Sequence, residues 1–124
     1  MTNDENKVEV TMNEITTAQY EDMVCRTAIY PGRLQNNFVY PTLGLVGEAG
    51  EVAEKVKKLL RDKNNELTPE YRDEIIKELS DVQWYVAALA HELGTTLGHV
   101  MKVNHDKLLS RMARGKLQGS GDNR

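Results

Sequence analysis

The sequence predicts a small all-α protein, in which four helices form one bundle-like domain. The chain has 124 residues, enough for a single domain with a modest core. Apolar residues recur at spacings of three and four along most of the chain, which is the period of a helix. Proline and glycine fall mostly between these periodic segments, and no segment has the alternation of a strand.

Two helices are predicted in the N-terminal half. Residues 1–12 are polar and are expected to form a flexible arm. The first helix is expected over 13–29, because the Pro-Gly pair at 31–32 cannot continue it. After a loop, the second helix is expected over 41–61. Its first residue is a proline, which suits the first turn of a helix.

Two further helices are predicted in the C-terminal half. Thr68 is a good N-cap and precedes a proline, so the third helix is expected over 69–93. Gly94 suits the position just after its end. The fourth helix is expected to begin after a threonine cap and to end near Met112. The helical domain therefore spans 13–114, and residues 115–124 form a polar tail.

Composition excludes some classes of function. The net charge of −3 gives no electrostatic reason to bind nucleic acid, although the basic group of helix two could bind a few phosphates. No apolar run is long enough to span a membrane, and the polar N-terminus is not a signal peptide. Cys25 is the only cysteine, which favours a cytoplasmic location; we expect it to pack in the core.

Four acidic residues occupy matched positions on the second and third helices. One apolar stripe is formed by Leu45, Ala49, Val52, Val56 and Leu59, and another by Ile75, Leu79, Val82, Val86, Leu89 and Leu93. Glu48 and Glu51 lie to one side of the first stripe, and Glu78 and Asp81 lie at the same offsets from the second. Two helices joined by a short loop pack antiparallel, which brings the two pairs together.

Carboxylates gathered at a buried edge repel one another and lose solvation, and a divalent cation removes both costs. Oxygen ligands favour Mg²⁺ or Mn²⁺ over zinc. Glu54 falls opposite the apolar stripe and is expected to face solvent. Glu74 lies on the acidic side of its helix, but a place outside the metal site is favoured over an accessory role. The alternative is that all these acids are simply solvated flanks of amphipathic helices.

The segments that contain these four acids resemble those of a known protein family. The segments LGLVGEAGEVAEKVKK and KELSDVQWYVAALAHELG resemble the MazG-like all-alpha nucleoside triphosphate pyrophosphohydrolases. Their motif has two adjacent acids and a third, followed by E-x-x-D on the next helix. Glu48, Glu51, Glu78 and Asp81 match its last four acids, which the resemblance assigns to metal binding. The chain has Gly47 where many members have the first glutamate.

The resemblance continues into the fourth helix. VNHDKLLSRMARGKLQGSGDNR is similar to a family segment N-x-x-K-L-x-x-R with a GSGDNR-type tail. Asn104, Lys107 and Arg111 share one helix face, as a phosphate clamp requires, although a solvated polar face has the same pattern. Tyr85 borders the acidic site and could stack on a base or simply pack; Lys55 is a weaker phosphate ligand. The tail could fold over a nucleotide through Lys116, Ser120, Asp122, Asn123 and Arg124.

The resemblance implies hydrolysis of a (deoxy)nucleoside triphosphate to the monophosphate and pyrophosphate, with Glu48 or Glu51 also orienting or deprotonating the water. The GSGDNR-type tail looks like that of phage-associated members that deplete (d)GTP, which places the protein in a host cytoplasm.

Trp84 lies opposite the apolar stripe of its helix, so we expect a partner to cover it in a homodimer or homotetramer. His91, His99 and His105 are expected to be non-catalytic.

Two other classes of function remain open at the level of sequence. One is a non-catalytic helical interaction or regulatory module. The other is a di-iron helical bundle, which usually requires E-x-x-H pairs that this chain lacks.

Overall fold

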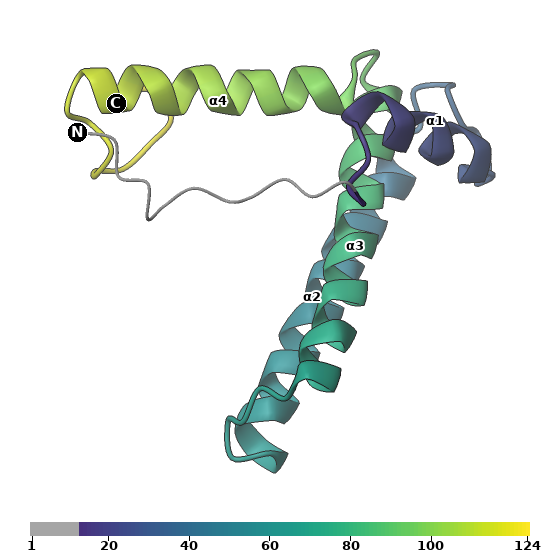
Figure 1. The fold of residues 1–124 in the computed structure, drawn as a ribbon. Coiled ribbons are helices and arrows are strands. Elements are labelled where there is room, and N and C mark those ends of the chain that lie inside the picture. Colours follow the sequence, from purple (N-terminus) through teal and green to yellow (C-terminus); the bar gives the residue numbers. More distant parts are fainter. Residues whose placement is uncertain (1–12) are drawn as a thin grey trace.

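The computed structural model describes residues 13–124, and within them the chain forms four helices and no strand. The helices are α1 (Thr17–Thr27), α2 (Val39–Asp62), α3 (Pro69–Glu92) and α4 (Leu97–Ala113). The all-α prediction is confirmed for this range (Figure 1). The arm predicted at 1–12 lies outside the described residues. Among the described helices, none is long and apolar enough to cross a membrane.

Local capping decides where the helices begin. Thr68 caps α3 by accepting a hydrogen bond from the Tyr71 amide, with proline at the first position, as predicted. The first helix begins later than the predicted Asn13. Thr16 and Gln19 form a capping box, in which each side chain binds the other residue's backbone amide and fixes the start of α1.

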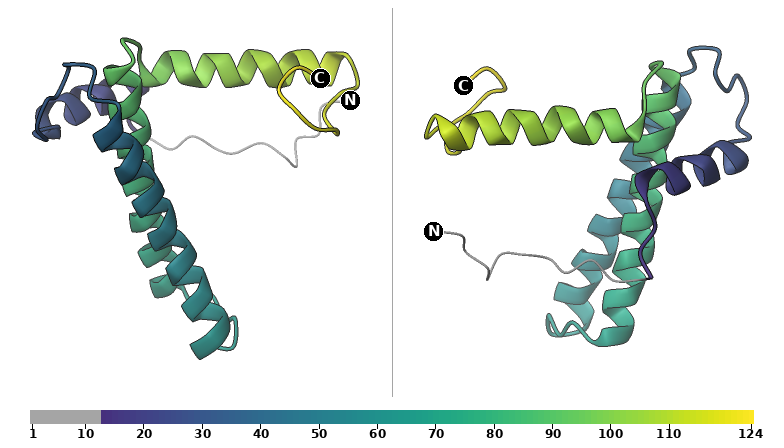
Figure 2. Two further views of the ribbon diagram at one scale, coloured as in Figure 1. Left: turned by 180° about the vertical axis from the view of Figure 1, so that it is seen from behind. Right: turned by 45° about the horizontal axis from the view of Figure 1, so that its top comes forward.

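Helices α2 and α3 form a long antiparallel hairpin, and α4 turns sharply away from it (Figures 1 and 2). The α2–α3 turn includes Asn64 and Asn65, with positive φ values of 51° and 57°. The change of direction after α3 occurs at Gly94, whose φ of +75° is the left-handed conformation expected at a helix end. Thr96 then caps α4. The fourth helix contacts α1 and α3 within the described chain, but not α2.

The buried core lies where α1 crosses the C-terminal half of α3 and the start of α4. Its members are Val24, Ala28, Tyr30, Ala87, Ala88 and Leu97, with Tyr20, Trp84 and Val86 packed against them. Trp84 is half-buried within the single chain, and the prediction that a partner chain covers it stays a prediction. Helix α1 of the same chain covers part of this side chain, and the indole N–H donates to Thr27 Oγ1 at 2.9 Å.

The predicted apolar stripes are buried only in part. Leu59 is buried, but Val56, Leu93 and Leu79 are exposed, the last with 55% of its surface accessible. The reason is geometric, because α2 packs on α3 alone, and a pair of helices covers only a narrow strip of each surface. Helix α4 also exposes a row of apolar side chains: Val100, Met101, Val103, Leu108, Leu109 and Met112. Such a surface is typical of an interface between proteins.

Cys25 does not pack in the core as predicted. It is exposed, and its Sγ lies 4.0 Å from His91 Nδ1 on α3. His91 Nε2 in turn lies 3.0 Å from the Glu21 carboxylate, which also accepts a hydrogen bond from the Leu97 amide at the start of α4. Glu21 and His91 therefore join α1, α3 and α4 at the elbow.

Candidate metal and nucleotide site

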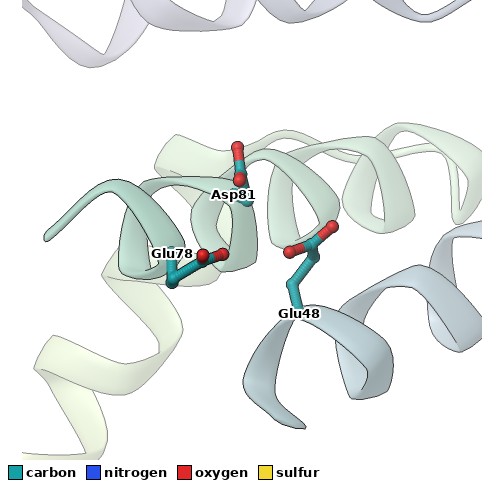
Figure 3. A group of neighbouring side chains, drawn as sticks. All are labelled: Glu48, Glu78 and Asp81. Carbon is teal, nitrogen blue, oxygen red and sulfur yellow. The ribbon is translucent and has the colours of Figure 1, made fainter. Parts of the chain in front are cut away.

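Three of the four predicted metal ligands meet between α2 and α3. One carboxylate oxygen from each of Glu48, Glu78 and Asp81 lies within 4.8 Å of the others. Glu48 reaches from α2 towards the two acids on α3, which are one turn apart (Figure 3). Glu48 and Glu78 are half-buried, and Asp81 is exposed. The antiparallel packing predicted from the helical period therefore does bring both helices' acids together.

The carboxylates of this cluster repel one another and are only partly solvated. The pKa of Glu48 is raised above its ordinary value of 4.5, first by burial and then by the charges of Asp81, Glu78 and Glu51. Oxygen donors that repel one another at this spacing fit a hard divalent cation. Among the described residues, Glu48, Glu78 and Asp81 form the one group of three or more acidic, histidine or cysteine side chains whose atoms are close enough to hold a metal ion.

Glu51 stands apart from the other three acids. It is exposed one turn along α2 and does not belong to the close group, although its charge reaches Glu48. Lys55, one turn further, donates to the carboxylate of Glu74 at 3.3 Å. Glu54 forms ion pairs with lysines of its own helix, including Lys57 at 2.8 Å, which agrees with its predicted place away from the site.

An aromatic hollow adjoins the carboxylates. A cleft of about 310 Å³ is lined by Glu48, Asp81, Trp84 and Tyr85. Trp84 and Tyr85 pack edge to face with centroids 5.0 Å apart, and they also line a second hollow of about 380 Å³. Burial, followed by the nearby charges of Tyr40, Glu48 and Asp81, raises the pKa of the Tyr85 hydroxyl. Tyr85 therefore borders the acidic cluster, as the sequence predicts.

Gly44 explains how Tyr85 comes so close to α2. A Cβ at position 44 would overlap the carbon atoms of the Tyr85 ring, so only glycine leaves room for it. By contrast, a Cβ at Gly47, the position where many relatives have an acid, meets nothing within 4 Å.

Two tyrosines of this hollow were not predicted. Tyr30 and Tyr40 stack with centroids 4.7 Å apart and line the second hollow together with Trp84 and Tyr85. Tyr30 lies in the loop that follows α1, and Tyr40 lies in the first turn of α2, before the predicted start of that helix at 41. A helical wheel for 41–61 therefore assigns no direction to either residue. The available signal was the concentration of aromatic residues around the Pro-Gly turn at 31–32.

The predicted phosphate ligands lie on a different arm of the molecule. Asn104, Lys107 and Arg111 are all on α4, which extends away from the hairpin that carries the acids (Figures 1 and 2). Lys107 and Arg111 instead contact Asp122 of the C-terminal tail. One chain in this conformation does not bring the clamp to the carboxylates.

Comparison with known proteins decides the family. Residues 41–114 match the MazG nucleotide pyrophosphohydrolase domain. This chain belongs to the MazG nucleotide pyrophosphohydrolase family. The match covers more than half of the sequence and includes all four acids and the whole of α4. This MazG domain is also similar to the gene 37 protein of Mycobacterium phage L5, with 52% identity over 109 residues, covering 85% of this chain and 96% of the phage protein. No solved structure matches the chain.

Membership explains the constellation that the structure brings together. The matched segment begins at Pro41, so the MazG domain contains the α2–α3 hairpin. The sequence predicts that this chain is a short, phage-type member of the family, and its similarity to a phage protein agrees with that. Helix α1, which forms much of the core and one wall of the aromatic hollow, lies before the matched residues.

Proposed function

We propose that this MazG domain hydrolyses a (deoxy)nucleoside triphosphate to the monophosphate and pyrophosphate, with Mg²⁺ as cofactor and Mn²⁺ as a substitute. The observation that carries the proposal is the three-carboxylate group of Glu48, Glu78 and Asp81 beside an aromatic hollow. The acids suit the metal-bound phosphates, and the aromatic walls suit a base. Together they favour a nucleotide over an inorganic polyphosphate.

Each group has a chemical part in the proposed reaction. Glu48, Glu78 and Asp81 would hold the cation, and Glu51, one turn along α2, is the proposed fourth ligand. When bound, a divalent cation neutralises phosphoryl oxygens and lowers the pKa of an attacking water. Glu48 or Glu51 orients that water and accepts its proton.

The aromatic hollow is proposed to hold the base. Tyr85 and Trp84 line both the acidic cleft and the neighbouring hollow, so a nucleotide can extend from one to the other. Flat aromatic walls stack on any base, and a purine offers the larger face. A preference for (d)GTP belongs to this proposal.

The polyphosphate is proposed to meet Asn104, Lys107 and Arg111 of a second copy of the chain. Within one chain α4 carries these residues away from the acids, and its exposed apolar row needs a cover. A homodimer, or a homotetramer built from it, satisfies both requirements at once. Lys55 lies nearer the acids but is already paired with Glu74.

A single assay tests the reaction. The purified chain is incubated with each of the common (deoxy)nucleoside triphosphates and Mg²⁺, and the products are separated by ion exchange. The proposal expects monophosphate and pyrophosphate in equal amounts, from (d)GTP fastest. Release of single phosphate would contradict it, and no turnover of any nucleotide would favour a non-catalytic helical module.

Matched variants connect the reaction to the site. Glu48→Gln and Asp81→Asn should abolish turnover, because each removes a charge from the proposed metal site. Glu54→Gln is the control, since it changes the same kind of side chain on α2 but pairs with lysines outside the site. Full activity of Glu48→Gln would remove the acids from the mechanism.

A further inference from the structure

The tail after α4 is folded into a closed loop rather than left free in solvent. The guanidinium of Arg124 donates to three backbone carbonyls, those of Lys116 at 3.1 Å, Leu117 at 3.2 Å and Gly121 at 2.7 Å. The carbonyl of Arg124 accepts in turn from Arg114, the residue that follows α4. These four bonds hold the loop against the helix that carries the predicted phosphate clamp.

The loop places one carboxylate on that clamp. Asp122 Oδ1 lies 3.2 Å from Lys107 Nζ and 3.4 Å from a terminal nitrogen of Arg111, which also donates to the Gly121 carbonyl at 3.3 Å. The two sides of this contact differ in burial. The Arg111 side chain is 6% exposed and is fixed, whereas the Asp122 side chain is 83% exposed.

This arrangement leaves the clamp incompletely satisfied. A single carboxylate charge faces two positive charges, and one oxygen accepts from both cations. The Nε–H of Arg111 is buried without a hydrogen-bond partner. A buried N–H of a charged group is costly to leave unpaired, and a guanidinium is built to bind two oxygens of one anion. A phosphate group carries more charge and more acceptor oxygens than Asp122 offers.

We propose that Asp122 is an internal occupant of this anion site, which a phosphate group of the substrate displaces. The tail would then act as a self-inhibitory latch, closed over Lys107 and Arg111 in the free protein and opened by polyphosphate. This inference rests on the proposed function, because it takes the clamp to be a phosphate site. The ion pairs that close the latch are weak, because an exposed carboxylate such as Asp122 contributes little stability to an ion pair.

Binding of inorganic pyrophosphate, measured by calorimetry without a divalent cation, tests the latch. Asp122→Asn should bind pyrophosphate about twofold to fivefold more tightly than the native chain, the size of effect expected when the weak ion pairs of an exposed carboxylate are removed. Asp106→Asn is the matched control, because Asp106 is also exposed and paired with a lysine of α4, Lys102. Its affinity should equal the native value. Unchanged or weaker binding by Asp122→Asn would overturn the latch.

A second variant covers the case in which Asp122→Asn alters the loop itself. Arg124→Ala removes the bonds that close the loop and should also tighten pyrophosphate binding. In the native chain, hydrogen exchange of amides 116–124 should accelerate when pyrophosphate is added; slower exchange would mean that the tail clamps the anion instead, contrary to the proposal. None of these measurements needs turnover, so pyrophosphate binding with loop opening but no hydrolysis would reject the proposed function and retain the latch.

Discussion

At the scale of single residues, Glu48 combines two opposing demands. It sits half-buried between α2 and α3, where a neutral side chain would be more stable. Burial and the three neighbouring acids raise its pKa above 4.5, so the folded chain binds this proton more tightly than the unfolded chain. The stability linked to it is present below pH 4.5 and is lost as the pH rises through the raised value. At neutral pH the ionised Glu48 therefore lowers the stability of the folded chain, and a bound cation would restore it.

Glu48→Gln is expected to separate these effects. Without divalent cations the variant should melt above the native chain at neutral pH, and the difference should disappear below pH 4.5, where Glu48 is protonated in both states. Added Mg²⁺ should raise the melting temperature of the native chain and leave that of the variant unchanged. Thermal denaturation followed by circular dichroism checks both results, with Glu54→Gln as the reference. A lower melting point for metal-free Glu48→Gln would contradict this account of the site.

Gly44 and Gly47 lie one turn apart on α2, but the effect of adding a Cβ on the stability of the fold is expected to differ between them. Gly44→Ala should destabilise the fold, since its Cβ would overlap the Tyr85 ring and push this side chain out of the hollow. Gly47→Ala should stabilise the chain by up to about 1 kcal/mol, the helix-propensity difference, because its Cβ meets nothing within 4 Å. Urea denaturation of both variants measures the contrast. Equal effects would mean that Tyr85 does not pack on Gly44.

At the scale of elements, the junction of α1, α3 and α4 depends on Glu21. Burial raises the pKa of this carboxyl, but hydrogen bonds from the Leu97 amide, His91 and the Gly98 amide outweigh burial and lower it overall. A lowered pKa means that its contribution to stability is present above the ordinary value of 4.5. The contribution is lost as the pH falls through the lowered value.

Glu21→Gln is therefore expected to destabilise the chain by about 1–3 kcal/mol at neutral pH, the cost of weakening bonds to buried donors. The side chain is only 16% exposed, so solvent screens this loss little. The difference from the native chain should shrink in acid, as Glu21 becomes protonated. Denaturation curves at neutral and acidic pH measure it. A difference that grows in acid would show that the charge of Glu21 does not support the elbow.

The elements also show what sequence can and cannot predict. Thr68, Gly94 and the approach of Glu48 to Glu78 and Asp81 were predictable, because caps and helical faces depend on residues within a few positions. The start of α1 was not, since the capping box of Thr16 and Gln19 competed with an equally polar site at Asn13. The cover of Trp84 depends on contacts between distant segments, which a wheel for one helix does not contain. For the same reason the burial of Arg111 by the tail was not predictable from the face of one helix.

At the scale of the whole molecule, the α2–α3 hairpin and α4 carry different parts of the proposed triphosphate site. The hairpin carries the acids and the aromatic hollow, and α4 carries Lys107 and Arg111 together with an exposed apolar row. Neither arm is a complete triphosphate site. A second copy that covers the apolar row could bring its clamp to the first copy's acids, which is a stronger reason for a dimer than Trp84 supplied.

Leu109→Glu is expected to weaken assembly without unfolding the chain. Leu109 is about half exposed in the middle of the apolar row, so the charge costs little in the single chain but is buried in a dimer. Light scattering after size exclusion should give a larger fraction of single chains than for the native protein. Leu60→Glu is the control, being similarly exposed on α2, outside the α4 row. An unchanged mass for Leu109→Glu would place the interface elsewhere.

Mixing two inactive variants tests whether one active site is built from two chains. Glu48→Gln lacks a proposed metal ligand, and Lys107→Ala lacks a clamp residue. If α4 of one chain completes the site of the other, a mixed dimer contains one site with both changes and one fully native site. Random exchange makes half of the dimers mixed, so activity should recover to about a quarter of the native value. If each chain uses its own α4, every site keeps one defect and the mixture stays inactive, which would assign the clamp to a movement of α4 within the chain.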